Sequence, residues 1–151
     1  MSEARIRRLA PVLDMALDEE RKAAKVLGQC QKQFEEAEVR LRDLEYYCSE
    51  YAKGWSQRGS QGVGRDWLMN YQRFMAQMEV AIDQQRQTVR WHGESIERAR
   101  EHWRQRYQRL EALRKLIEKY RQEAQARADR QEQKLLDELS QRAHSQRTNN
   151  S

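Results

Sequence analysis

Two cysteines, three histidines and a glycine-rich segment are the features of this chain that we considered first as signs of catalysis or ligand binding. Cys30 and Cys48 form no CxxC pair, and His92 lies within a long stretch of helical periodicity. A cysteine nucleophile with a histidine base requires a cavity, which a seam between two helices does not provide. The segment GSQGVG lacks the lysine and the preceding strand of a phosphate-binding loop. We therefore expect no enzyme activity, no cofactor and no metal.

The elements that carry these residues follow a seven-residue repeat, in which apolar side chains recur at the first (a) and fourth (d) positions. The repeat runs from Ile6 to Trp55 with one polar exception, Glu20. It resumes at Leu68 and runs to Ala124, with polar exceptions at Gln85, His92 and Arg106. Repeats sustained over this many heptads are typical of coiled-coil helices.

The predicted fold is all-α: a long antiparallel two-helix coiled coil, a helical hairpin with an overhanging C-terminal helix. The glycine-rich segment between the two repeats supplies the turn, with Gly54 as the cap that ends the first helix and Asp66 as the cap that begins the second. The expected elements of this single hairpin over 1–151 are a helix at about 5–53, a turn at about 54–65, a helix at about 66–143 and a disordered tail at 144–151.

The register of the predicted hairpin depends on the charged residues that occupy core positions of the repeat. A turn centred near residue 63 places Glu20 opposite Arg106, so the two charges in the seam pair with each other. A shift by one heptad would leave Glu20 facing Ala99, and burying an unpaired charge is costly. In the preferred register the second repeat ends where the first helix runs out. Residues beyond about 124 should therefore overhang, and we hypothesise that a binding partner orders them.

Aromatic residues flank the predicted seam near the turn. An apolar stripe occupies the g positions and consists of Tyr47, Trp67, Phe74 and Ala81. It is either a widened core or an exposed docking patch, and the pattern leaves both open. Trp91 falls on an outward position, where it either contacts a partner or lies along the helix surface.

Charge and hydropathy limit the class of partner. The chain carries a net charge of +5, and 98–147 holds 14 Lys or Arg against 8 Asp or Glu. This basic surplus is either a solvated helix face or a match to an acidic protein surface. A nucleic-acid-binding coiled coil remains an alternative, but the sequence has no zinc-ligand, RRM-like or GXXG-loop signature and no nucleic acid is expected. No apolar run approaches the roughly 20 residues of a membrane span, so we expect a cytoplasmic protein without membrane insertion.

Three segments resemble the FliJ family of the bacterial flagellar type III export apparatus: LEYYCSEY (44–51), NYQRFMAQMEVAIDQQ (70–85) and HWRQRYQRL (102–110). The resemblance covers nearly the whole chain, and the second segment is its most specific part. It implies a non-catalytic stalk that sits in the ring of the export ATPase FliI, links it to the export gate protein FlhA, and handles export chaperones. Such a protein associates peripherally with the inner membrane at the flagellar base. A virulence-type secretion stalk of the same architecture is the alternative.

The resemblance also implies a surface for the export gate on both helices near the turn. Carried over residue by residue, it consists of Arg40, Leu44, Tyr47, Tyr51, Phe74, Met78, Ala81 and Gln85. Three members of the apolar stripe belong to this set, so the heptad pattern and the resemblance indicate the same region. The opposite end, which carries the N-terminus and the overhang, would then enter the ATPase ring.

Overall fold

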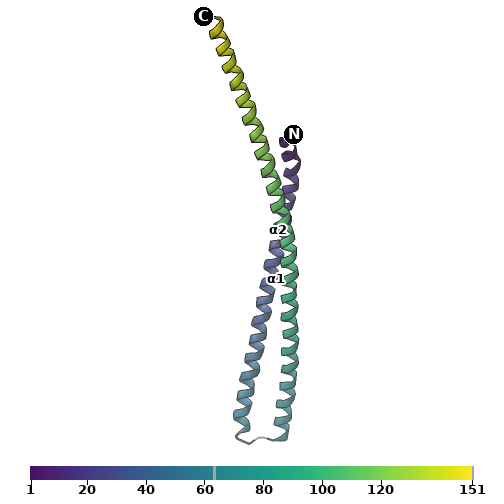
Figure 1. Cartoon of the computed structure of the whole chain (residues 1–151). Helices are drawn as coiled ribbons and strands as arrows, with labels where there is room; N and C mark the ends of the chain where they lie inside the picture. Colours follow the sequence, from purple (N-terminus) through teal and green to yellow (C-terminus); the bar gives the residue numbers. More distant parts are fainter. Residues whose placement is uncertain (63, 151) are drawn as a thin grey trace. The chain divides into compact units, whose positions relative to one another are not determined.

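The computed structural model describes residues 1–62 and 64–150. It consists of two long helices packed against each other, α1 (Ser2–Gly59) and α2 (Arg65–Asn149) (Figure 1). The described part of the chain contains no strand, so the predicted all-α hairpin is confirmed. Two compact units divide the chain: Met1–Arg21 with Gln105–Ser151, and Lys22–Arg104. The first unit holds the chain ends and the second holds the turn.

Both helices are longer than predicted. α1 continues past Gly54, the predicted cap, and ends at Gly59. It also continues through Pro11, although proline removes one backbone hydrogen bond from a helix. Asp66 lies in the first turn of α2 instead of capping it, where its carboxylate complements the positive end of the helix dipole. The tail predicted to be disordered is helical as far as Asn149.

Two glycines shape the turn that joins the helices. Gly62 has a φ of 85°, a left-handed conformation that glycine adopts without strain. A Cβ at Gly59 would lie 3.3 Å from Cη2 of Trp67, so any larger residue there would push against the indole. Residue 63, on which the predicted turn is centred, lies outside the described residues.

The core of both units follows the heptad repeat. All the a and d positions are buried or half-buried except Leu68, which is exposed at the start of α2. The buried apolar residues are small on α1 and large on α2. They are Ala16, Ala23 and Ala37 on α1, and Met78, Ile82, Ile96, Leu110 and Ile117 on α2. The predicted seam is therefore confirmed, with Leu68 as its one correction.

Close contacts support the predicted register in each unit. In the turn unit, the rings of Trp55 and Tyr71, a predicted pair, lie with centroids 5.3 Å apart. In the other unit, the guanidinium of Arg5 lies 5.3 Å from the ring centroid of Tyr120. Ser2 Oγ donates a hydrogen bond to Glu123 Oε2 at 3.5 Å, so the first residues of α1 meet α2 just before Ala124.

The C-terminal overhang, residues 125–149 of α2, begins immediately after this contact. Every residue from 125 to 150 is exposed. Figure 1 shows this part of α2 extending beyond the N-terminus of α1. The position at which the overhang begins is therefore the predicted one. That a partner orders it stays a prediction.

Candidate docking surface near the turn

Six aromatic rings from the two helices form an aromatic cluster beside the turn. α1 contributes its rings at a spacing of four residues, which places them on one helix face, and α2 contributes rings at spacings of three and four. The closest ring centroids lie 3.9 Å apart, between Tyr51 and Phe74, and 4.4 Å apart, between Trp55 and Trp67. The full cluster is Tyr47, Tyr51, Trp55, Trp67, Tyr71 and Phe74.

The apolar stripe divides into a covered part and an exposed part. Trp67 and Phe74 are half-buried against rings of α1, so they belong to a widened core at this end of the seam. Tyr47 keeps 55% of its surface exposed although its ring lies 6.3 Å from that of Tyr51 and 6.4 Å from that of Phe74. The widened core therefore describes Trp67 and Phe74, whereas docking of a partner on the exposed Tyr47 stays a prediction.

The eight residues expected to bind the export gate differ in how much surface they offer. Arg40 and Tyr47 are exposed, seven residues apart on α1, and thus lie on one side of the helix. Met78 is buried in the seam and offers almost nothing to a partner. The other five, Leu44, Tyr51, Phe74, Ala81 and Gln85, are half-buried. Direct contact with a partner would therefore concentrate on Arg40 and Tyr47.

The two tryptophans expected to contact a partner also differ. Trp67 packs on Trp55 and against Gly59, so its main contacts close the turn. Trp91 is exposed, and its ring meets that of His92 edge to face at a centroid distance of 5.0 Å. Trp91 thus remains available at the surface of the turn unit.

A polar layer interrupts the seam of the turn unit. Gln85 Nε2 donates a hydrogen bond to the backbone oxygen of Ala37 at 3.0 Å, which satisfies an amide at a d position. One heptad further along α2, His92 Nδ1 is buried and has no hydrogen-bond partner among the described residues. An unsatisfied buried polar atom costs about 1–3 kcal/mol. This layer is therefore a weak point of the seam, and the predicted placement of His92 in the seam is confirmed.

Charged side chains of the two helices also meet in the other unit. Arg106 Nη1 donates to Glu19 Oε2 at 3.2 Å, and Arg109 Nη1 donates to the same oxygen at 3.3 Å. The pair of Arg106 with Glu20, which is half-buried beside Glu19, stays a prediction. The long arginine side chain reaches along the flank of the seam, where Glu19 lies, so the salt bridge forms beside the core.

Replacing Glu19 with glutamine is expected to lower the free energy of unfolding by about 0.5–1 kcal/mol, because both arginines lose a partly solvated carboxylate partner. The loss should shrink at high salt, which screens charges at the surface. Urea denaturation at low and high salt measures both effects. A larger loss from Glu20→Gln than from Glu19→Gln would restore the pairing predicted from the sequence.

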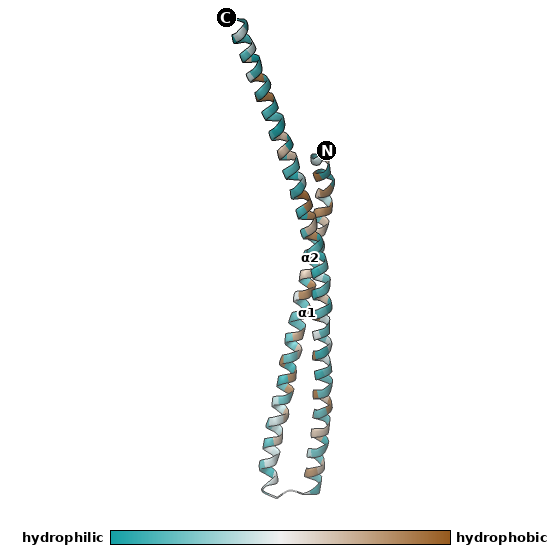
Figure 2. Ribbon diagram, viewed as in Figure 1, coloured by the Kyte–Doolittle hydropathy of each residue, from teal (hydrophilic) through white to brown (hydrophobic). Residues whose placement is uncertain are grey.

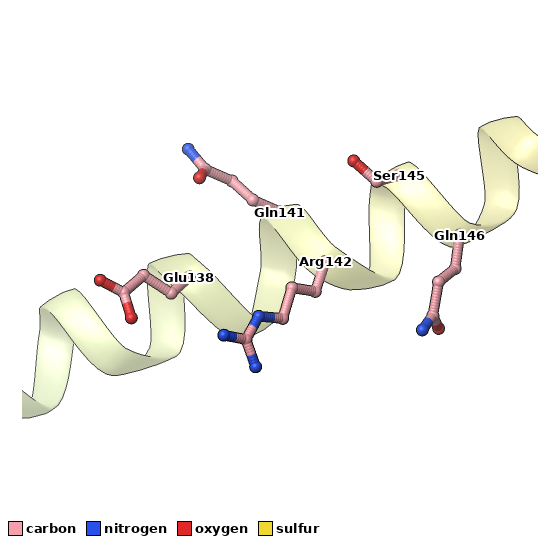
Figure 3. A pocket seen from close by; sticks show the side chains of 5 residues that line it. All are labelled: Glu138, Gln141, Arg142, Ser145 and Gln146. Carbon is pink, nitrogen blue, oxygen red and sulfur yellow. The ribbon is translucent and has the colours of Figure 1, made fainter.

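A hollow on the C-terminal overhang provides no enclosed site. It is lined by Glu138, Gln141, Arg142, Ser145 and Gln146, which all project from α2 (Figure 3). No described residue of another element forms an opposite wall, so a small ligand there would stay in solvent. In residues 1–62 and 64–150 no cluster of three or more His, Cys, Asp or Glu could hold a metal ion. No helix among these residues is long and apolar enough to cross a membrane.

Comparison with known proteins identifies the family. The family model described as the flagellar FliJ protein matches residues 5–149. The chain belongs to the FliJ family. The flagellar FliJ protein of Escherichia coli K12 is 34% identical over 135 residues, which cover 89% of this chain and 92% of that protein. The flagellar FliJ protein of Salmonella typhi is 32% identical over 136 residues, with the same coverage of both chains.

Structural comparison supports the fold of this FliJ family member. A Chlamydia trachomatis protein named as a YscO homologue superimposes with a TM-score of 0.68 and covers 95% of this chain and 97% of its own. At 23% sequence identity this likeness concerns the fold alone. Membership of the FliJ family makes the chain a component of the flagellar type III export system.

Proposed function

We propose that this chain is the stalk and adaptor of the flagellar export apparatus. In this role it binds the ring of the export ATPase FliI, couples that ring to the export gate protein FlhA, and handles export chaperones. It is itself non-catalytic, and it works in the cytoplasm against the inner membrane at the flagellar base. The observation that carries the proposal is the exposed ring of Tyr47 on the aromatic cluster of a FliJ-family hairpin.

The physical properties of this surface suit a protein partner. Tyrosine and tryptophan often dominate binding energy at interfaces because they combine a large contact area with few rotatable bonds. Tyr51 and Phe74 support the ring of Tyr47, so little conformational freedom is lost when a partner covers it. Arg40 on the same side of α1 would favour a gate surface with an apolar pocket and an acidic rim.

The unit that holds the chain ends suits the opposite contact. Exposed arginines lie on both of its helices, among them Arg5, Arg7 and Arg8 on α1 and Arg121 and Arg127 on α2. A basic surface steers association with an acidic one and makes the rate of association depend on salt. This charge supports the proposal that the end of the hairpin with the N-terminus and the overhang enters the ATPase ring.

The variant Tyr47→Ala tests the proposal. We expect it to weaken binding to the purified cytoplasmic domain of FlhA at least about tenfold, as truncation of an interface hot spot does. It should leave the helical circular dichroism unchanged, and it should stimulate ATP hydrolysis by FliI as the wild-type protein does. Isothermal titration calorimetry and a steady-state ATPase assay measure the two activities.

Tyr46→Ala is the matched control, because Tyr46 is the neighbouring ring, is 69% exposed, and falls on an outward position of the repeat. It should bind the gate protein normally. Equal loss in both variants would show that the aromatic cluster does not define the binding surface. If the wild-type chain neither bound FliI nor altered its hydrolysis rate, the stalk role would be wrong.

A further inference from the structure

Three leucines interrupt the otherwise polar surface of the C-terminal overhang. Leu135, Leu136 and Leu139 are each just over half exposed, although leucine is among the residues most often buried. Figure 2 shows a few brown, hydrophobic positions within the mainly hydrophilic C-terminal part of α2. We call these three residues the leucine patch. Clustered exposed leucines do not stabilise a helix that packs on nothing, and such a patch indicates a surface that another molecule covers.

The leucine patch does not continue the seam that α1 and α2 share. Continued past Ala124, that repeat would place Arg127, Gln131 and Lys134 at its core positions. Leu135 follows Lys134 by one residue and is therefore rotated by roughly 100° around the helix. Whatever covers the leucine patch must approach a different face of α2 from the one that α1 would use.

A second, shorter heptad track runs through the leucine patch. Its positions alternate at spacings of four and three residues, the spacing of a coiled-coil core. They are Ala128, Glu132, Leu135, Leu139, Arg142 and Gln146. All six are exposed, and the track lies wholly within the C-terminal overhang.

Two copies of this track complement each other when they run antiparallel. Leu135 and Leu139 lie at equal distances on either side of Asp137, and so do Glu132 and Arg142. We propose that the overhang pairs antiparallel with the overhang of a second copy of this chain, about a two-fold axis near Asp137. Leucine then faces leucine, and each glutamate faces an arginine of the other copy.

Other antiparallel registers of the track lose this match. A shift by one heptad in one direction sets Leu139 against Arg142, and in the other direction sets Leu135 against Glu132. Each would press a charged group onto the leucine patch at a desolvation cost. Pairing between Glu132 and Arg142 therefore favours the centred register. The contact between Arg106 and Glu19 is a pairing of the same kind within the hairpin.

The length of the overhang also fits this pairing. The track spans 128–146, within the fully exposed 125–149, and of its six positions Ala128 alone lines a hollow with the first residues of α1. Because the pairing is antiparallel, residues before 125 of each copy lie beyond the C-terminal end of the other. Association costs translational and rotational freedom, and the four leucines that lie on the paired tracks, two from each copy, offset little of it, so the dimer should be weak and concentration-dependent. A paired overhang would exclude any other partner of the same face.

Sedimentation equilibrium of the full chain over a range of concentrations tests the pairing. We expect a reversible monomer–dimer equilibrium, and we expect Arg142→Glu to raise the dissociation constant at least about tenfold by placing like charges opposite each other. Lys134→Glu is the matched control. It makes the same change in net charge, but Lys134 points outward from the track, so the dissociation constant should stay within about twofold.

Combining Glu132→Arg with Arg142→Glu should restore dimerisation, since the reversed charges pair again. The two side chains of one copy are separated by roughly 15 Å along the helix, so the rescue cannot arise within a single chain. Circular dichroism confirms that each variant is helical. A wild-type chain that is monomeric at every concentration, an equal effect of Lys134→Glu, or the absence of rescue would each overturn the proposal.

Discussion

Leu110→Ala is expected to lower the free energy of unfolding by about 3 kcal/mol. Leu110 is the largest side chain that is fully buried, with 2% of its surface exposed. Removing it loses the transfer free energy of the side chain and leaves a cavity, which together cost about 2–5 kcal/mol at core leucines. The two long helices can close such a gap only locally, since both continue past it. Urea denaturation followed by circular dichroism measures the loss.

Leu68→Ala is the matched control for this prediction. Leu68 occupies the same a position of the heptad repeat, but 47% of its surface is exposed. Its truncation should cost about 1 kcal/mol or less, because much of the side chain is already in water. If the free energy of unfolding fell equally in Leu110→Ala and Leu68→Ala, burial of the side chain would not explain the cost of truncation.

Ala23→Leu is expected to lower the free energy of unfolding by about 2 kcal/mol. Ala23 is buried at a d position, and the predicted register places it opposite the large side chain of Trp103. Extra carbon atoms there must push the helices apart or force side chains from their preferred rotamers, at a cost of about 1–3 kcal/mol. Thermal and urea denaturation measure the change.

Ala24→Leu provides the comparison, because Ala24 is the next residue of α1 and is exposed. Both amino acids are good helix formers, so this variant should change the free energy of unfolding by about 0.5 kcal/mol or less. A double variant, Ala23→Leu with Trp103→Leu, should recover part of the lost stability if the two positions face each other. Failure to recover any would place Trp103 elsewhere.

The heptad repeat made the seam predictable. Burial of one helix face requires apolar residues at a period near 3.5, so the sequence pattern determines which side chains meet. Ala16, Ala23 and Leu110 are buried as predicted, and the overhang begins where the repeat stops after Ala124. The family resemblance seen in the segments around Tyr47 and Phe74 was confirmed over 5–149.

Predictions that depended on single residues succeeded less often. Gly54 was expected to end α1, but the helix continues to Gly59, where a Cβ would lie 3.3 Å from the Trp67 side chain, closer than ordinary van der Waals contact. A glycine within a helix costs about 1 kcal/mol, and packing of the adjacent half-buried Trp55 can outweigh that. Helix ends are therefore decided by tertiary contacts as much as by local preference.

The candidate docking surface also depended on tertiary contacts that the sequence pattern does not specify. Periodicity placed Tyr47 and Phe74 on one stripe, but it could not tell which ring the partner helix covers. In the structure Phe74 lies against Tyr51, while Tyr47 stays exposed beside them. The resemblance named both as gate-binding residues, and the difference in exposure now makes Tyr47 the sharper target for mutation.

By itself the sequence determined the fold class of this protein, because long helices with a heptad repeat bury their apolar faces by packing together in a coiled coil. It also determined the approximate register, through the cost of burying an unpaired charge. Tertiary structure alone decided that Arg106 pairs with Glu19 and that the leucine patch faces solvent. Those outcomes depend on how far side chains reach sideways and on where the partner helix ends.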